Sequence, residues 1–259
     1  MILDFDYQMK FSYSQPVSLC YFTIKCIPMD TARQSLLHYQ IKMNPETNYS
    51  YGTDSFKNKK IYGSIRQNHD FFEFKIHGKV QIKDMDYEEQ ADLNQIGMYR
   101  HPYGLCIPNH ELKQYYESMK LDHEASYLKC IKMMNQLHTD FLYVPLQTNV
   151  NTSASEAWKL KKGVCQDYAH IYIVLARLAN IPCRYVCGLM AGEGKSHAWV
   201  EVMCDDKWIG LDPTNNCKVN SNYIKLGHGL DASSCSINRG IMYGGGQQTQ
   251  QIQSIVQQQ

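Results

Sequence analysis

Several features that would assign this chain to a specialised class are missing from it. Residues 1–6 have neither a basic start nor a long apolar core, so we expect no signal peptide. No apolar run approaches the roughly 20 residues that a helix needs to cross a bilayer. Together these absences predict a cytoplasmic protein that does not associate with a membrane.

The chain also lacks an excess of charge of either sign. Its 26 Lys and Arg residues and 25 Asp and Glu residues give a formal net charge of +1 at pH 7. No basic excess points to nucleic acid, and there is no acidic tail. The 259 residues, 44% hydrophobic and 20% charged, are typical of a globular protein with two compact domains or one large one.

The ten cysteines show no arrangement that favours a metal site. Without a secretion signal we expect reduced thiols, mostly buried as small hydrophobic residues. Cys183 and Cys187 lie four apart in an expected strand, but no second Cys or His pair has the spacing of structural zinc ligands. No run of alternating acidic residues resembles a calcium loop. We therefore expect neither a metal nor another cofactor.

The front of the chain is rich in Val, Ile, Phe, Tyr and Thr, in short runs separated by turn residues. The runs cover residues 17–27, 36–43, 60–66 and 69–76. Their spacing predicts a small antiparallel β-sandwich without a catalytic constellation. A charged, turn-rich passage at 83–97 predicts the connection to a second domain, which divides the chain into residues 1–97 and 98–259.

A cysteine lies where a helix is expected to begin. Large or apolar residues recur at positions 168, 171, 172, 175, 178 and 179, and Pro182 forbids continuation, so the helix should cover about 165–180. Gly163 would let the chain turn into it. Cys165 in its first turn would meet unpaired N–H groups and the positive end of the macrodipole, which favour thiolate over thiol. Taken alone, the pattern fits a small buried core residue equally well.

A β-hairpin is expected next. Residues 197–204 alternate at period two, 205–206 can form a tight turn, and 207–214 follow as the second strand. If the loop has only two residues, Asp212 is a diagonal neighbour of His197 on the same face, at about 7–8 Å between backbones. A three-residue loop would turn Asp212 to the wrong face unless a bulge intervened.

Cys165, His197 and Asp212 would form a nucleophile, a base and an orienting carboxylate. His197 would take the Cys165 proton or hold it in a thiolate–imidazolium pair. Asp212 would fix the tautomer of the ring and stabilise its charge. The backbone N–H of Cys165 is a natural first donor to a developing oxyanion.

Two other polar residues of the helix are interpreted as structural. Asp167 is expected to cap the helix or to pair with Arg184 or Lys162. His170 lies about 140° around the helix from Cys165, which favours a core position over the role of base.

The chain after residue 216 carries weaker signals. Glycines at 227–229 and 244–246 predict tight loops that flank short strands. His228 and Arg239 could approach the mouth of the site. The glutamine-rich residues 247–259 contain three aliphatic positions, which predict a last edge strand with a frayed end.

Four separated blocks resemble the bacterial transglutaminase-like (papain-like cysteine protease) superfamily. They are GVCQDYAH at 163–170, IPCRYV at 181–186, HAWVEV at 197–202 and DPTN at 212–215. The resemblance implies an α+β fold in which the cysteine-bearing helix packs on an antiparallel sheet behind a β-rich N-terminal region. It also implies Cys165 as nucleophile, His197 as base and Asp212 as third member. An upstream aromatic or amide side chain often supplies a second oxyanion donor in this superfamily, and Tyr143 and Trp158 both remain candidates.

The family includes proteases, amidases, cross-linking acyltransferases and inactive relatives, so the resemblance leaves the reaction open. We expect acyl transfer on an amide bond of a peptide or protein through a thioester on Cys165. Hydrolysis is favoured because water is the default acceptor and nothing marks a lysine-binding site. Transfer to an amine and a non-catalytic peptide-binding module are the alternatives, and a metal or redox protein built on the cysteines is a third hypothesis.

Overall fold

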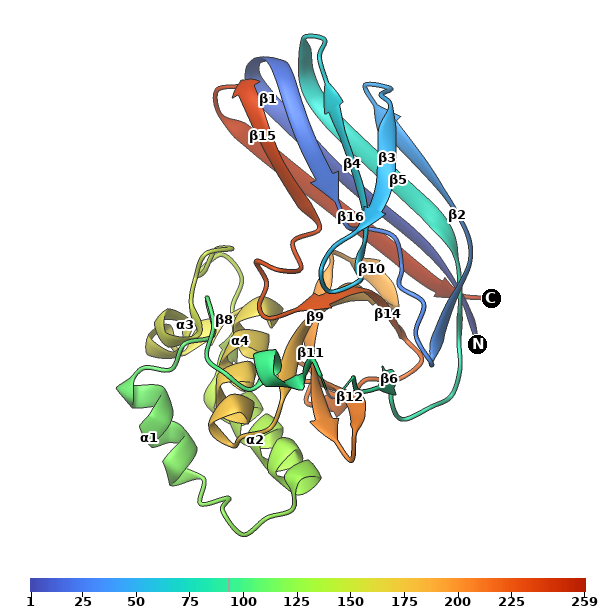
Figure 1. The fold of residues 1–259 in the computed structure, drawn as a ribbon. Helices are drawn as coiled ribbons and strands as arrows, with labels where there is room; N and C mark the ends of the chain where they lie inside the picture. Colours follow the sequence, from blue (N-terminus) through green and yellow to red (C-terminus); the bar gives the residue numbers. More distant parts are fainter. Residues whose placement is uncertain (93) are drawn as a thin grey trace.

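The computed structural model describes residues 1–92 and 94–259. It consists of a tall β-sandwich stacked on a mixed part of sheet and helices, as Figure 1 shows. Among the described residues, no helix combines the length and the apolar character that a membrane span requires. The α+β fold class expected from the sequence is confirmed.

A single long strand, β1 (Ile2–Ile24), runs through both layers of the sandwich and turns over near residues 14–16 (Figure 1). Its first part pairs with two neighbours, which are in turn extended outward. The strands of this layer besides β1 are β2 (Gln34–Asn44), β5 (His69–Ile82), β10 (Gly192–Gly194) and β16 (Gln248–Gln258). The second part of β1 builds the other layer with β3 (Tyr49–Thr53), β4 (Lys59–Ile65) and β15 (Asn238–Gly244).

Alternation of buried and exposed side chains explains why these strands form a sandwich. In the first part of β1, Phe5, Tyr7, Met9 and Phe11 are buried, while the residues that alternate with them are more exposed. Phe22, from the second part, lies 5.0 Å from Phe72 of β5 between ring centroids, so the two layers share one core. Burying such aromatic side chains contributes roughly 25 cal/mol for each Å² removed from water. The predicted sandwich is confirmed.

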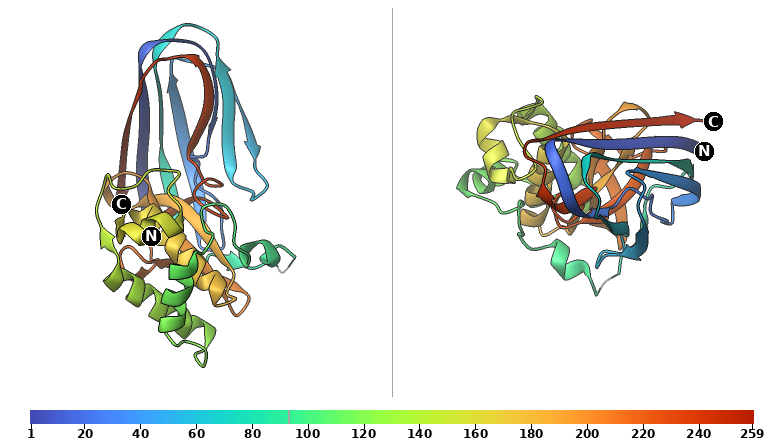
Figure 2. Two further views of the ribbon diagram at one scale, coloured as in Figure 1. Left: turned by 90° about the vertical axis from the view of Figure 1, so that its left-hand side faces the viewer. Right: turned by 90° about the horizontal axis from the view of Figure 1, so that it is seen from above.

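The two C-terminal strands belong to the sandwich rather than to the second part of the molecule. β15 and β16 both pair with β1, and Leu3 is paired with Gln258. The termini therefore lie side by side in both views of Figure 2. The sequence division at residue 97 does not follow the sheets. The predicted last strand is confirmed, and β10 pairs with only residues 254–256 on its other side, but the end is not frayed, since pairing with β1 continues to Gln258. A partner so distant in the chain leaves no local pattern, and the many glutamines hide the alternation that buries Ser254 and Val256.

The second part is a six-stranded sheet covered by helices. The sheet contains β6 (Glu89–Gln90), β9 (Cys183–Met190), β11 (His197–Cys204), β12 (Lys207–Asp212), β13 (Cys217–Lys218) and β14 (Tyr223–Gly229), in the order β13-β12-β11-β9-β14 with β6 beside β12. The helices are α1 (His110–Ser118), α2 (Ser126–Asp140), α3 (Ala154–Leu160), α4 (Cys165–Leu178) and the 3₁₀ turn η1 (Ile96–Tyr99). α4 packs on β9 and β11 and contacts the three other α-helices, which explains why its interior residues are almost all buried.

Two side-chain amides join the sandwich to the edge of this sheet. Gln34 accepts a hydrogen bond from the Lys225 backbone N–H (2.8 Å) and donates one to the Lys225 carbonyl (2.9 Å). Asn58 makes the same pair of hydrogen bonds with the backbone N–H and carbonyl of His228, both at 2.8 Å. Each amide thus replaces a neighbouring strand along β14, and the otherwise open edge is satisfied. These bonds hold the sandwich against the sheet.

Candidate active site

The start of α4 is shaped by a buried carboxylate. Asp167 accepts hydrogen bonds from the Val164 backbone N–H (2.7 Å) and from the Thr148 hydroxyl (2.6 Å), which confirms its expected capping role. The alternative of an ion pair with Lys162 or Arg184 was wrong. Gly163 is required because a Cβ there would lie 2.4 Å from the Asp167 Oδ2 atom. The turn therefore depends on the close approach of this carboxylate, and it presents Cys165 at the first helical position.

The hairpin of β11 and β12 has the two-residue loop that the sequence predicts. Asp205 and Asp206 both have positive φ, 49° and 58°, as a type I′ turn requires. The resulting register pairs Cys204 with Lys207. It brings His197 and Asp212 together, with 2.7 Å between Nε2 and Oδ2. The predicted neighbourhood of these two residues is confirmed.

His197 connects the carboxylate with the cysteine. Nε2 faces Asp212, and the thiol of Cys165 lies within hydrogen-bonding reach of the ring, which leaves Nδ1 as the nitrogen that faces it. Burial disfavours the charged ring, but the hydrogen bonds to Asp212 and Cys165 outweigh it and raise the pKa of His197 to about 10. Trp199 lies nearly parallel to the ring at 6.3 Å between centroids. The structure thus brings together all three residues named from the sequence.

Asp212 is fully buried and held by several donors. Oδ2 accepts from His197 Nε2, from the Tyr223 hydroxyl (2.8 Å) and from Asn215 Nδ2 (2.7 Å). Oδ1 accepts from the backbone N–H groups of Thr214 (2.9 Å) and Asn215 (3.2 Å). Burial alone would raise the pKa of Asp212, but these donors keep it below its usual value. The carboxylate is therefore ionised and fixed in direction.

Sequence reasoning missed two of these partners. Asn215 could have been found, because Asp212-Pro213 opens a turn in which an aspartate side chain commonly binds backbone N–H groups two and three residues later. Tyr223 carries no such signal, since it reaches Asp212 from β14, which is not adjacent to β12 in the sheet.

A cavity of about 500 Å³ lies beside the two reacting residues, between the sandwich and the second part. Gln166 and Ser196, the neighbours of Cys165 and His197 in sequence, line it together with residues of β1, β9, β15 and β16. Arg239 is the one formally charged side chain among the described lining residues. Arg239 thus lines the cavity that reaches the sequence neighbours of Cys165 and His197, whereas His228 lies in a different pocket.

The two candidates for a second oxyanion donor differ in position. Tyr143 lies on β7 (Leu142–Tyr143), which pairs with β8 (Lys162–Gly163), and it is close enough to Cys165 for the thiol to affect its pKa. Burial, with a smaller contribution from Cys165, raises the pKa of Tyr143, so its hydroxyl keeps its proton. Trp158 is buried against Tyr115, with 4.0 Å between ring centroids. The geometry favours Tyr143.

Accessibility separates Cys165 from most other thiols. All ten cysteines lie within the described residues and are free, and eight of them are buried. Cys165 and Cys217 are partly exposed. Among the described residues, no group of three or more His, Cys, Asp or Glu side chains is placed to hold a metal ion.

A thiol at a helix start, next to a histidine that a buried carboxylate orients, is the arrangement typical of the papain-like fold. Comparison with protein families agrees. Residues 113–213 match the transglutaminase-like superfamily, and residues 3–81 match the bacterial transglutaminase-like N-terminal region. The chain therefore carries a transglutaminase-like domain together with the N-terminal region of its bacterial members, as the resemblance implied.

Individual relatives support the fold. A solved structure of a proposed cysteine protease from Cytophaga hutchinsonii superposes with a TM-score of 0.82 over 100% of this chain and 91% of that one, at 19% identity. An uncharacterized protein of Mycobacterium leprae is 35% identical over 114 residues, and one of Mycobacterium bovis is 32% identical over 127 residues. These matches cover 40% and 43% of this chain and 40% of each relative's length.

Proposed function

We propose that the protein is a cysteine-dependent hydrolase of amide bonds in peptides or proteins. The observation that carries the proposal is the position of the His197 ring, with Nε2 on Asp212 and the other nitrogen towards Cys165. A nucleophile, a base and an orienting group within contact of one another are the parts that acyl transfer requires.

In the proposed reaction, the Cys165 sulfur attacks the carbonyl carbon of the amide while His197 holds the thiol proton. The tetrahedral intermediate collapses to a thioester, and His197 gives its proton to the departing amine. A water molecule then attacks the thioester, passing a proton to His197. Collapse of the second intermediate releases the acid, and the sulfur returns to its starting state.

Two groups are candidates as donors for the developing oxyanion. The backbone N–H of Cys165 is among the first-turn donors that helix geometry leaves unpaired. The Tyr143 hydroxyl lies near the same sulfur and remains protonated. We assign it as the second donor, a group whose removal in comparable sites costs about 10²–10³ in rate.

The cavity beside the site supports hydrolysis over transfer to an amine. A lysine acceptor carries a positive charge until it reacts, and a site that binds it needs a carboxylate nearby. None of the described residues that line the cavity is acidic, and Arg239 would repel such an acceptor. Transfer to a neutral amine remains the second candidate, because the chemistry up to the thioester is identical.

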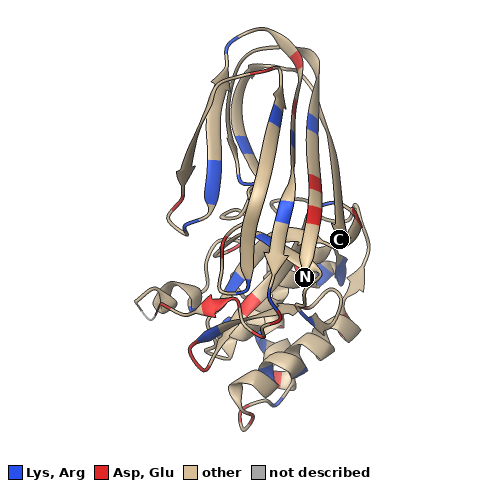
Figure 3. Cartoon of the chain, turned by 90° about the vertical axis from the view of Figure 1, so that its right-hand side faces the viewer, with Lys and Arg blue, Asp and Glu red and all other residues tan. Residues whose placement is uncertain are grey.

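The surface charge supports a peptide rather than a nucleic acid as substrate. Lysine and arginine are interspersed with aspartate and glutamate over the face drawn in Figure 3, without a basic stripe. The ten free thiols fit a reducing compartment, and we propose a cytoplasmic location. Recovery of the protein from a periplasmic fraction of its host would contradict that assignment.

The proposal is tested by alkylation with iodoacetamide over a pH series, read by mass spectrometry at each cysteine. Cys165 should react fast well below pH 8, and His197→Ala should slow it by at least about tenfold because the charged ring is lost. Cys217 serves as the internal control, since it is equally classed as partly exposed but does not face a histidine. If Cys165 reacts no faster than Cys217, the site is not a nucleophilic one and the proposal fails.

A second experiment separates the two acceptors. Peptide amides are incubated with the protein in water enriched in heavy oxygen, with and without a neutral amine such as hydroxylamine. Hydrolysis incorporates the heavy oxygen into a free acid, whereas amine transfer gives the adduct. Cys165→Ala should remove both products.

A further inference from the structure

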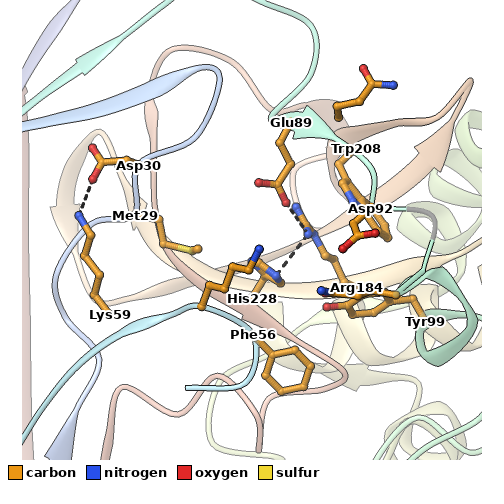
Figure 4. Close-up of a pocket in the computed structure, with 13 residues that line it drawn as sticks. Met29, Asp30, Phe56, Lys59, Glu89, Asp92, Tyr99, Arg184, Trp208 and His228 are labelled. Atoms are coloured by element: carbon orange, nitrogen blue, oxygen red, sulfur yellow. Dashed lines mark hydrogen bonds and ion pairs between the residues drawn. The ribbon is translucent and has the colours of Figure 1, made fainter. Parts of the chain in front are cut away.

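A second pocket lies between the sandwich and the sheet, away from the reacting residues. It has a volume of about 250 Å³, and Figure 4 shows it between strands of both parts of the molecule. Arg184 of β9 is paired with Glu201, whereas His197 is paired with Gly188, four residues further along β9. The pocket is thus separated from the catalytic histidine by roughly 13 Å along the strand.

The floor of the pocket is a buried network of charges. Glu201, fully buried, accepts hydrogen bonds from Arg184 Nε (2.5 Å) and from Lys225 Nζ (2.7 Å to each oxygen). Glu89 approaches Arg184 Nη1 at 2.8 Å, and the guanidinium stacks on Trp208 at 4.2 Å. Two cations and two carboxylates balance each other. The network therefore needs no further charge.

Two donors in and beside this charge network lack a hydrogen-bond acceptor among the described residues. His228 Nε2 lies 3.2 Å from Arg184 Nη1, and a guanidinium can only donate, so Nε2 accepts and Nδ1 carries the proton. Burial, and then the nearby cations, hold the pKa of His228 well below its usual value, in agreement with a neutral ring. Within the described chain, neither His228 Nδ1 nor Arg184 Nη2 has a partner, although both residues are more than nine-tenths buried. Buried donors without an acceptor are unfavourable, so a bound group should supply one.

The rim of the pocket adds one charge of each sign. Lys59 is paired with Asp30 at 2.6 Å, as the dashed line in Figure 4 marks. Lys57 and Asp92 also line the pocket, and neither has an ion-pair partner among the described residues. The pocket thus offers buried donors and a lysine for a carboxylate, and an aspartate for an ammonium group.

We propose that this pocket binds a small zwitterion of the amino-acid or short-peptide class. The carboxylate accepts from His228 Nδ1, with Lys57 nearby, and the ammonium group faces Asp92. Such a site is independent of the reaction at Cys165, because Arg184 lies at the opposite end of β9 from the partner of His197 and none of the described residues that line the pocket belongs to the group of Cys165, His197 and Asp212.

The test is calorimetric titration of the Cys165→Ala protein, which cannot consume the probe, with glycylglycine. Saturable binding is expected. Glycylglycinamide, which lacks the carboxylate, should bind about tenfold more weakly or worse, since a hydrogen bond to a charged group is lost. N-acetylglycine, which lacks the ammonium group, should lose a few-fold because Asp92 is exposed.

Variants of the lining residues test whether the probe binds in this pocket. Lys57→Gln and Asp92→Asn change exposed residues and should weaken glycylglycine a few-fold without unfolding the protein. His228→Phe should weaken it about tenfold or more. Lys60→Gln, three residues from Lys57 but outside the pocket, is the matched control, and Arg239→Gln tests binding in the catalytic cavity.

Three outcomes would overturn the proposal. No saturable binding of any probe would mean that ordered water alone satisfies the donors. Equal affinity for glycylglycine and glycylglycinamide would remove the assigned carboxylate. Loss of binding in Arg239→Gln but not in Lys57→Gln would move the ligand to the catalytic cavity.

Discussion

Two buried carboxylates on one sheet, Asp212 and Glu201, have similar surroundings and different consequences. Both are fully buried, and in both cases donors outweigh burial and hold the pKa of the carboxyl below its usual value. Asp212 faces a histidine, which can gain and lose a proton. Glu201 faces Lys225 and Arg184, and the guanidinium keeps its proton at any ordinary pH. Because both carboxylates are buried, the charge of each strongly affects its partners. Only Asp212 faces a histidine, which can exchange a proton during a reaction.

The largest expected effect concerns Asp212, the proposed catalytic member of this pair. Asp212→Asn keeps the shape of the side chain but removes the charge that orients and stabilises the His197 ring. We expect the rate of amide hydrolysis to fall about 10⁴-fold, as for the equivalent change in other triads. Rates measured on a peptide amide test this, with Asp205→Asn in the turn of the same hairpin as control. A fall of less than tenfold would show that Asp212 is a structural carboxylate like Glu201.

The next largest effect concerns Glu201, the structural member of the pair. Glu201→Gln leaves Arg184 and Lys225 buried without a counter-charge, so the free energy of unfolding should fall by about 3–5 kcal/mol. Urea unfolding followed by fluorescence measures it. Glu193→Gln on β10, where the residue is exposed, should change stability by less than about 0.5 kcal/mol. Equal stability of the two variants would contradict the comparison.

A smaller effect concerns Asn58, which joins the sandwich to β14 beside the buried charges of Arg184, Glu201 and Lys225. Asn58→Ala removes both hydrogen bonds to the His228 backbone and leaves a buried N–H and carbonyl without partners. We expect a loss of about 1–3 kcal/mol in the free energy of unfolding. Asn48→Ala, at an exposed position in the same sandwich, is the control. Hydrogen exchange along β14 should increase in Asn58→Ala. Unchanged exchange there would show that Asn58 does not protect the edge of this strand.

The last effect is spread over several pH units, so each step is small, and it sharpens the comparison through pH. Because the folded-state pKa of His197 is raised to about 10, the stability it contributes is fully present below its unfolded pKa of about 6.5 and is lost as pH rises towards 10. Stability should therefore fall by up to about 1.4 kcal/mol per pH unit in that window. Unfolding of the wild type and of His197→Gln at several pH values isolates this contribution. A difference that is constant from pH 6 to 10 would contradict the raised pKa.

The catalytic cluster could be predicted from the sequence because its geometry is local. His197 and Asp212 belong to one hairpin, and the two-residue turn at Asp205 and Asp206 fixes their register. Cys165 is placed by a helix whose periodic face and terminating Pro182 are visible in the sequence. Ser153 followed three residues later by Glu156 is likewise a local capping-box pattern, and it caps α3 in the structure.

The buried group of charges around Glu201 could not be predicted, because its members lie far apart in the sequence. Arg184, Glu201, Lys225 and Glu89 come from four strands, and each looks like an ordinary surface charge in its own segment. Asn58 meets His228 across 170 residues of chain. Pairing at such separations is decided by the packing of the sandwich on the sheet, which no local periodicity reports.

The pairing of Leu3 with Gln258 also constrains the order in which the protein can be completed during synthesis. The ribosome releases β1 first, but the strand that covers one of its sides is made more than 200 residues later. Until then β1 presents an open hydrogen-bonding edge, which is a site for pairing with other chains. Joining the adjacent ends through a short linker and opening the chain within residues 83–87 would place β16 before β1 in translation. Such a circular permutant should yield more soluble protein when expressed rapidly.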